Sequence, residues 1–139
     1  IENAGYENVR AVAPGDKIIV DSIPVEVVPM YNIVKTNFHP KHNNWVGYIL
    51  SLEGVRIYHA GDTERIPEMK NLECDIVLMP LGQTYTMNSV EEAAEAVNDV
   101  KARVAIPIHY GLYEGTKEDA LKFKDLLSDK TEVIIKEIE

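Results

Sequence analysis

Short apolar runs separated by turn residues fill the first part of the chain. Valine and isoleucine dominate residues 17–20 and 23–29, which predicts two β-strands after a turn at residues 14–16. A further short strand is expected at residues 9–12. Residues 30–44 show no clean periodicity, and we expect a loop there.

A hairpin signal follows this loop. Residues 45–52 and 55–59 are apolar runs on either side of a Glu-Gly turn, a pattern typical of two antiparallel strands. Trp45 and Tyr48 lie in the first run. We expect these two aromatic side chains to belong to the core, which is the commoner place for such residues.

Strands and helices alternate in the second half of the chain. Residues 89–100 predict a helix, because Ser89 and Glu92 fit a capping box and apolar residues recur on one face. A second amphipathic helix is expected at residues 116–128. The remaining expected elements are a short helix at 66–71 and strands at 75–80, 103–109 and 131–138. This order, without repeats or linkers, predicts one α/β (α+β) domain over residues 1–139, with helices packed on a sheet.

Composition and charge narrow the class of protein. Of the 139 residues, 45% are hydrophobic and 27% are charged, which is typical of a soluble globular domain. The net charge of −9 disfavours nucleic acid as a partner, because an acidic surface repels phosphate backbones. No apolar run is long enough to span a membrane, and no signal peptide is visible. Cys74 is the only cysteine, so we expect no internal disulfide and a cytoplasmic location.

Histidine and aspartate side chains lie where three of the predicted segments end. Asp62 follows the hairpin, His109 ends the strand at 103–109, and His39 lies in the loop before the hairpin. Ligands usually gather at strand ends along one edge of a sheet. Imidazole and carboxylate are the ligands that zinc prefers when thiolate is absent. We therefore expect His39, Asp62 and His109 to converge on a metal site, with Gly61 allowing the sharp turn that aims the Asp62 carboxylate.

Other residues near these three are weaker candidates for metal binding or for lining the pocket. His42 competes with His39 as a ligand, since either spacing to Asp62 is acceptable. His59 should lie on the face of its strand opposite Ala60, where it would support or pack beside the site rather than bind metal. Three further residues could line the pocket through a hydroxyl or be purely structural: Tyr85, Thr86 and Tyr110.

The motifs around these residues resemble those of the metallo-β-lactamase superfamily. Residues 38–42 (Phe-His-Pro-Lys-His) resemble its third motif, residues 58–63 (Tyr-His-Ala-Gly-Asp-Thr) its fourth, and residues 106–111 (Ile-Pro-Ile-His-Tyr-Gly) its fifth. The chain looks most like the uncharacterised metal-dependent hydrolase branch, which includes relatives of sugar-phosphate lactonases. The resemblance extends over nearly the whole chain, from the turn at residues 14–16 onward.

This resemblance implies a fold and a chemistry. The fold would be the C-terminal half of a metallo-β-lactamase-like αββα sandwich. Asp62 would bridge two divalent metal ions and orient a hydroxide, with His39 on the first metal and His109 on the second. Zinc is the first expectation, although manganese and iron suit the same ligands. Such a site would hydrolyse an ester, lactone, thioester or phosphodiester in a small-molecule substrate.

One departure from the family pattern is large. The His-x-His-x-Asp-His motif is absent, and no histidine precedes His39. The sequence also begins with Ile1 rather than methionine, so we expect the N-terminal half of the domain to be missing from this sequence. That half would be the chain's first partner, and the fragment alone would bind metal poorly and be inactive. The alternatives are a non-catalytic half-domain that binds a partner chain or keeps the fold for packing, and a half-domain that pairs with another chain, as in a homo-oligomer, to rebuild the site.

Overall fold

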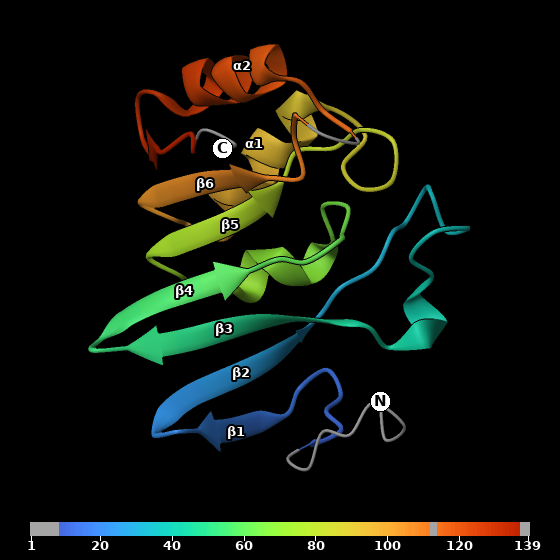
Figure 1. Ribbon diagram of the computed structural model, residues 1–139, viewed down its shortest axis with the longest axis vertical. Coiled ribbons are helices and arrows are strands. Elements are labelled where there is room, and N and C mark those ends of the chain that lie inside the picture. Colours follow the sequence, from blue (N-terminus) through green and yellow to red (C-terminus); the bar gives the residue numbers. More distant parts are fainter. Residues whose placement is uncertain (1–8, 112–113, 137–139) are drawn as a thin grey trace.

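The computed structural model describes residues 9–111 and 114–136, and its centre is a seven-stranded mixed sheet (Figure 1). The strands lie side by side in the order in which they occur along the chain. Three helical segments connect the later strands, and a fourth lies in the loop before β3. The elements are β1 (Lys17–Val20), β2 (Ile23–Pro29), η2 (Lys41–Asn43), β3 (Val46–Leu52), β4 (Val55–His59), η3 (Pro67–Asn71), β5 (Ile76–Pro80), α1 (Val90–Asp99), β6 (Val104–Ile108), α2 (Lys117–Leu127) and β7 (Glu132–Val133).

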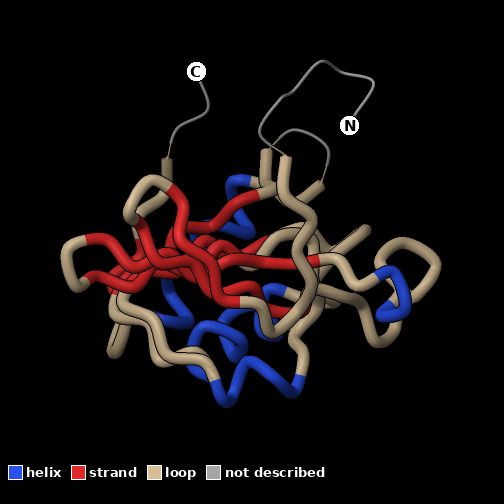
Figure 2. Tube along the Cα trace, turned by 90° about the horizontal axis from the view of Figure 1, so that it is seen from below, coloured by secondary structure: helices blue, strands red, loops and turns tan. Residues whose placement is uncertain are grey.

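The sheet changes from antiparallel to parallel at its middle strand. Strands β1 to β4 pair antiparallel, whereas β4 to β7 pair parallel. Each parallel pair needs a crossover, and η3, α1 and α2 provide these crossovers in turn. Crossovers of one hand bring their helices to one face of a sheet. Figure 2 shows most of the helical segments below the strands, which agrees with this rule.

Most of the elements expected from the apolar pattern are confirmed. The strands at 17–20 and 23–29 are found with those bounds, and the hairpin pairs β3 with β4 through a two-residue turn. The strand expected at residues 9–12 is wrong, because this segment is irregular and, among the described strands, β1 pairs with β2 alone. The last strand is shorter than expected and contains only Glu132–Val133. The end of the expected range, residues 137–138, lies outside the described residues.

The two long helices begin with side-chain caps. Ser89 accepts a hydrogen bond from the Glu92 backbone nitrogen at 3.1 Å, which is half of the capping box expected from the sequence. The other half is absent, since the Glu92 carboxylate accepts from the backbone nitrogens of Asn88 and Arg65 instead. Helix α2 has the complete box, in which Thr116 and its third following residue cap each other's backbone.

The hydrophobic core lies on the helical face of the sheet. Inward strand residues such as Ile49, Tyr58 and Val77 are fully buried there, together with Phe123 of α2. The other face also carries apolar side chains. In register across it lie Val25, Leu50, Ile57, Ile76 and Val104, and beside them Tyr48, His59, Leu78 and Ile106.

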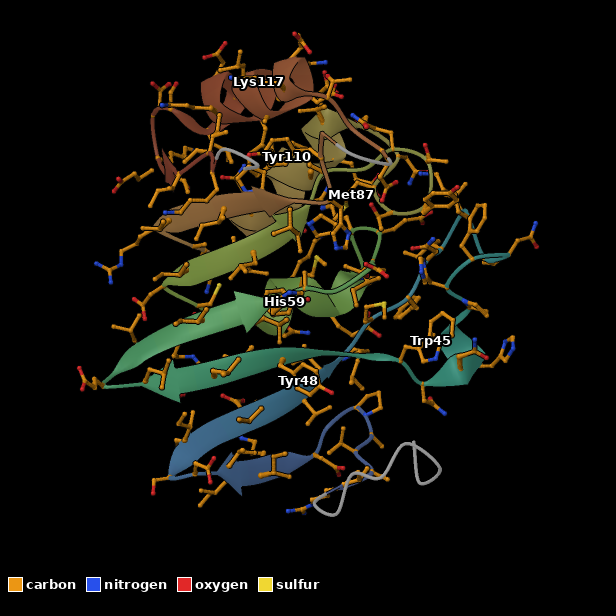
Figure 3. All side chains as sticks on the ribbon, in the orientation of Figure 1. Trp45, Tyr48, His59, Met87, Tyr110 and Lys117 are labelled. Atoms are coloured by element: carbon orange, nitrogen blue, oxygen red, sulfur yellow. The ribbon has the colours of Figure 1, made fainter. Side chains whose placement is uncertain are left out.

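Part of this second face is hollowed. A shallow apolar depression of about 360 Å³ extends over β1 to β4, and Tyr48, Leu50 and His59 are among its lining residues. Figure 3 shows Tyr48 and His59 side by side on the face nearer the viewer. Tyr48 is 36% exposed and Trp45 is 42% exposed, so the expectation that both belong to the core is wrong. We call the face of the sheet that carries this depression, opposite the buried core, the outer face.

Candidate metal centre

Three segments meet at the edge of the sheet where the parallel strands end. The loop after β2 carries His39, the turn after β4 carries Asp62, and β6 ends directly before His109. In Figure 1 these segments lie on the right, beyond the arrowheads of β4, β5 and β6. The strand ends therefore bring together residues that are far apart in the sequence.

Asp62 lies between two imidazole rings. Its Oδ2 is 3.7 Å from His39 Nε2, and its Oδ1 is 3.2 Å from His109 Nδ1. The His39 side chain is 14% exposed, whereas those of His109 and Asp62 are 35% and 47% exposed. The structure thus brings the three residues singled out from the sequence together, and it leaves the carboxylate open to solvent.

The backbone at this point adopts conformations that few residues tolerate. His109 has a φ of +61° and Gly61 a φ of +70°, both in the left-handed region. Such backbone strain in a non-glycine residue is often concentrated at functional sites. At Gly47 a Cβ atom would lie 2.7 Å from the backbone oxygen of His59, so the approach of β3 to the end of β4 requires glycine.

Hydrogen bonds select one tautomer of His39. Its Nδ1 lies 3.2 Å from the carbonyl oxygen of Tyr85, which can only accept, so Nδ1 carries the proton in a neutral ring. The amide nitrogen of Asn32 donates to the same oxygen at 2.7 Å. It also lies 3.3 Å from Nδ1, but two donors cannot bond to each other. The lone pair of Nε2 in the neutral ring therefore faces a carboxylate oxygen of Asp62, and a cation between two such acceptors would make the contact favourable.

The distances suit a metal ion as that cation. Two ligand atoms on one tetrahedral zinc lie about 3.4 Å apart, given metal–ligand bonds near 2.1 Å. The two contacts of Asp62 lie on either side of this value. In the described part of the chain, no three His, Cys, Asp or Glu side chains surround one common point. Each oxygen of Asp62 thus has one imidazole partner, and the donor set fits two half-complete metal positions rather than one complete position.

The two other histidines of interest lie outside this contact. His42 is exposed in η2, and the ion pair with Asp62 belongs to His39. His59 is exposed on the outer face while Ala60 is buried, as strand alternation predicts. The Nδ1 atom of His59 accepts from the backbone nitrogen of Gly61 at 3.2 Å. His59 therefore supports the turn that carries Asp62.

The three hydroxyl residues singled out from the sequence make the following contacts. The Tyr85 backbone contacts His39, whereas its ring packs edge-on against Phe38 at 4.9 Å. Thr86 is buried and donates to the carbonyl oxygen of Gly82. The Tyr110 hydroxyl donates to the carbonyl oxygen of Lys136, so this side chain points toward the end of the chain (Figure 3). Neither Tyr85 nor Thr86 caps α1, because Ser89 does so.

A second cluster anchors the same loop near its start. The Tyr31 hydroxyl donates to the Glu68 carboxylate at 2.8 Å, and Lys41 donates to the other oxygen of that carboxylate at 3.0 Å. The Lys41 ammonium also lies 4.4 Å from the centre of the Tyr31 ring. Burial raises the pKa of Tyr31 above its ordinary value, so this hydroxyl remains a donor at neutral pH.

Sequence reasoning missed three residues that hold the site together. Asn32, Lys35 and Glu64 lie in irregular segments, where no periodicity marks a residue as buried. Asn32 and Glu64 are nevertheless each 1% exposed. The sole signal in the sequence is that Glu64 stands two positions after Asp62, and adjacency alone does not predict a contact with the distant loop that carries His39.

Comparison with solved structures identifies the class of fold. A structure described as that of a candidate metal-dependent hydrolase from Parabacteroides distasonis superposes with a TM-score of 0.84 and 39% sequence identity. The match covers 95% of this chain and 59% of that one. The metallo-β-lactamase fold protein YhfI from Bacillus subtilis superposes with a TM-score of 0.71 at 11% identity, over 98% of this chain and 57% of its own. The α/β fold expected from the sequence is therefore a metallo-β-lactamase fold.

Sequence comparison gives the family. Residues 1–110 match the family model described as the Beta-lactamase superfamily domain. The chain belongs to this superfamily. A UPF0173 metal-dependent hydrolase from Thermococcus onnurineus is 37% identical over 121 residues, which are 84% of this chain and 53% of that protein. The corresponding protein from Methanopyrus kandleri is 35% identical over 130 residues, or 88% of this chain and 56% of that protein. The chain thus spans about half the length of the curated relatives that it matches.

The helices of the described residues are all short. None within residues 9–111 and 114–136 has both the length and the apolar character needed to cross a bilayer.

Proposed function

We propose that this chain is the C-terminal half of a metal-dependent hydrolase and supplies one side of a two-metal centre. The observation that carries the proposal is the position of Asp62, with one carboxylate oxygen facing His39 and the other facing His109. The family and the names of its relatives support this assignment, since the Thermococcus and Methanopyrus proteins are both called metal-dependent hydrolases.

Each residue has a distinct part in this proposal. His39, through Nε2, and His109 would each hold one metal ion, and Asp62, which lies between the two rings, would be the shared and catalytic carboxylate. When bound, two divalent ions supply Lewis acidity and a water whose pKa is lowered to about 7. The Asp62 carboxylate would offset the repulsion between two such cations and orient the attacking oxygen. His59 holds the turn of Asp62 through the Gly61 backbone.

The metal and the substrate are proposed by class. Imidazole and carboxylate ligands favour zinc, and manganese or iron suit the same donors. The substrate would be a small molecule with an ester, lactone, thioester or phosphodiester bond, because a metal-activated water attacks each of these. The net charge of −9 favours such substrates over nucleic acid. We also propose that the protein is cytoplasmic.

The rest of the domain would cover the outer face. This face presents rows of apolar side chains, and a large exposed apolar surface marks a place of contact. The Thermococcus relative has nearly half its length outside the match. We therefore propose that the missing half packs on this face and supplies the remaining metal ligands. The chain by itself would then be inactive.

A second candidate is a non-catalytic half-domain that binds a partner chain through the outer face. The same apolar face favours it, and the two candidates differ in metal content. The test uses a hybrid in which this chain is joined to the part of the Thermococcus onnurineus relative that the match leaves uncovered.

The hydrolase proposal predicts about two equivalents of zinc or manganese per hybrid chain, measured by elemental analysis after purification without chelator. Asp62→Ala and His109→Ala should lose most of this metal while remaining folded, and His59→Ala should lose much less. Metal-free hybrid that cannot be reloaded would favour the partner-binding candidate. Full metal content in Asp62→Ala would contradict the role of Asp62.

A further inference from the structure

The loop that carries His39 is tied to the Asp62 turn by a buried carboxylate. Glu64 accepts hydrogen bonds from three successive backbone nitrogens: its Oε2 lies 2.7 Å from those of Ile33 and Val34, and its Oε1 lies 2.9 Å from that of Lys35. The Glu64 side chain is 1% exposed. A charged acceptor makes stronger hydrogen bonds than a neutral one, and burial excludes competing water. The residue two positions after Asp62 therefore organises the first part of the opposite loop.

A hydroxyl group completes this connection. Thr63 is fully buried, and its Oγ1 donates to the carbonyl oxygen of Tyr31 at 2.9 Å. The backbone nitrogen of Glu64 donates to the same carbonyl at 3.2 Å. The segment that contains Asp62 is thus held along its length against the start of the loop.

The same loop is tied to a third segment by an ammonium group. Lys35 Nζ donates to the carbonyl oxygens of Gln83, Thr86 and Met87 at 2.6, 2.7 and 2.8 Å. Three carbonyls are the full complement for an ammonium with three donors. Lys35 therefore fixes the segment that contains Tyr85, whose carbonyl oxygen orients the His39 ring.

We propose that Glu64 and Lys35 are positioning residues that hold the His39 imidazole in its metal-binding tautomer, facing Asp62, before any metal is bound. Glu64 fixes the loop to the Asp62 turn, and Lys35 fixes it to the carbonyl group that accepts from His39 Nδ1. The consequence for metal affinity rests on the proposed function, whereas the orientation of His39 does not. A preorganised ring avoids the entropic cost of ordering on metal binding.

The test uses isotopically labelled chain in the presence of chelator. Nitrogen NMR of the His39 ring reports its tautomer, and amide hydrogen exchange reports the loop. The unaltered chain should show the Nδ1–H form and slow exchange at residues 33–35. In Glu64→Gln these amides should exchange about a hundredfold faster, because a buried charged acceptor is lost. The His39 ring should then populate both tautomers.

Lys35→Met is the second variant and keeps the test decisive if Glu64→Gln does not fold. It retains an unbranched side chain of similar length and removes the ammonium, so the His39 tautomers should again mix. Asp75→Asn is the matched control, since Asp75 also accepts from a backbone nitrogen, that of Arg56 at 2.9 Å, at the opposite ends of the strands. It should leave the His39 ring and the amides of residues 33–35 unchanged.

The outcomes separate this proposal from the proposed function. Folded Lys35→Met and Glu64→Gln with the tautomer and exchange of the unaltered chain would overturn the positioning role. In the hybrid, the zinc dissociation constant of Glu64→Gln should rise about ten- to a hundredfold, as for other residues that orient a ligand. If the unaltered hybrid binds no zinc, the hydrolase proposal fails, while the metal-free measurements still decide the role of Glu64 and Lys35.

Discussion

Single residues determine how closely the strands approach at the site. Gly47 has no Cβ, and this allows β3 to pass beside the backbone oxygens of His59 and Ala60, at 2.7 and 3.0 Å from where a Cβ atom would lie. Directly beyond Ala60 comes Gly61, whose left-handed backbone aims Asp62. The carboxylate position thus depends on a residue that carries no chemistry of its own.

Gly47→Ala should lower the free energy of unfolding by about 1–3 kcal/mol, the usual cost of forcing an extra methyl group into a packed site. Ser51→Ala is the control, because Ser51 lies on the same face of β3 and the change removes an atom instead of adding one. It should cost about 0.5 kcal/mol or less. Urea unfolding measures both variants, and equal stability of the two would show that β3 and β4 can separate without cost.

At the scale of elements, the strands could be predicted and the loops could not. The apolar runs at residues 17–20 and 23–29 identify strands because the strand period of two is local in the sequence. The loop between Met30 and Trp45 has no such period. Its shape depends on Glu64 and Lys35, whose partners lie more than twenty residues away. The motif could therefore predict that His39 lies beside Asp62, while the contacts that orient its ring could not be predicted.

The Asp75 carboxylate joins the parallel strands β4, β5 and β6 at the ends opposite to the candidate metal centre. Asp75, directly before β5, accepts from the backbone nitrogen of Arg56 in β4 and from the side chain of Arg103 beside β6, at 2.9 and 2.7 Å. The backbone hydrogen bond from Arg56, together with the Arg103 guanidinium, holds the pKa of Asp75 below its ordinary value. Because the folded-state pKa is the lower one, this carboxylate stabilises the fold above the unfolded-state pKa of about 3.9. The contribution is lost as the pH falls through the folded-state pKa.

Asp75→Asn should therefore be less stable than the unaltered chain at pH 6, and the difference should shrink toward zero at the most acidic pH at which the chain still folds. The reason is that a protonated aspartic acid resembles asparagine in charge. Urea unfolding at a series of pH values measures this difference. A gap that stays constant into the acid range would show that the Asp75 charge contributes nothing to folding.

At the scale of the whole molecule, most helical segments lie on one side of the sheet (Figure 2), and the opposite face is rich in apolar side chains. Apolar residues in register cross it from β2 to β6, as in the row formed by Val25, Leu50, Ile57, Ile76 and Val104. Sequence patterning could predict this property, since both faces of the middle strands read as apolar. It could not predict which face the helices cover, because that depends on the hand of the crossovers.

The isolated chain should associate through the outer face at micromolar concentration, with a mass by light scattering that rises with concentration. Paired changes Leu50→Lys and Leu78→Lys should keep it monomeric by placing charges on this face. The control pair, Leu121→Lys and Leu126→Lys, changes two exposed leucines of α2 and should leave the association unchanged. A chain that is well folded and monomeric at every concentration would contradict the proposal that another part of the protein packs on the outer face.

The most direct test of the metal centre is the position of the metal itself. Crystals of the hybrid grown with zinc should give anomalous diffraction peaks at the zinc absorption edge on both sides of Asp62, one toward His39 and one toward His109. Zinc bound elsewhere, or a loaded hybrid whose peaks do not touch the Asp62 carboxylate, would contradict the account.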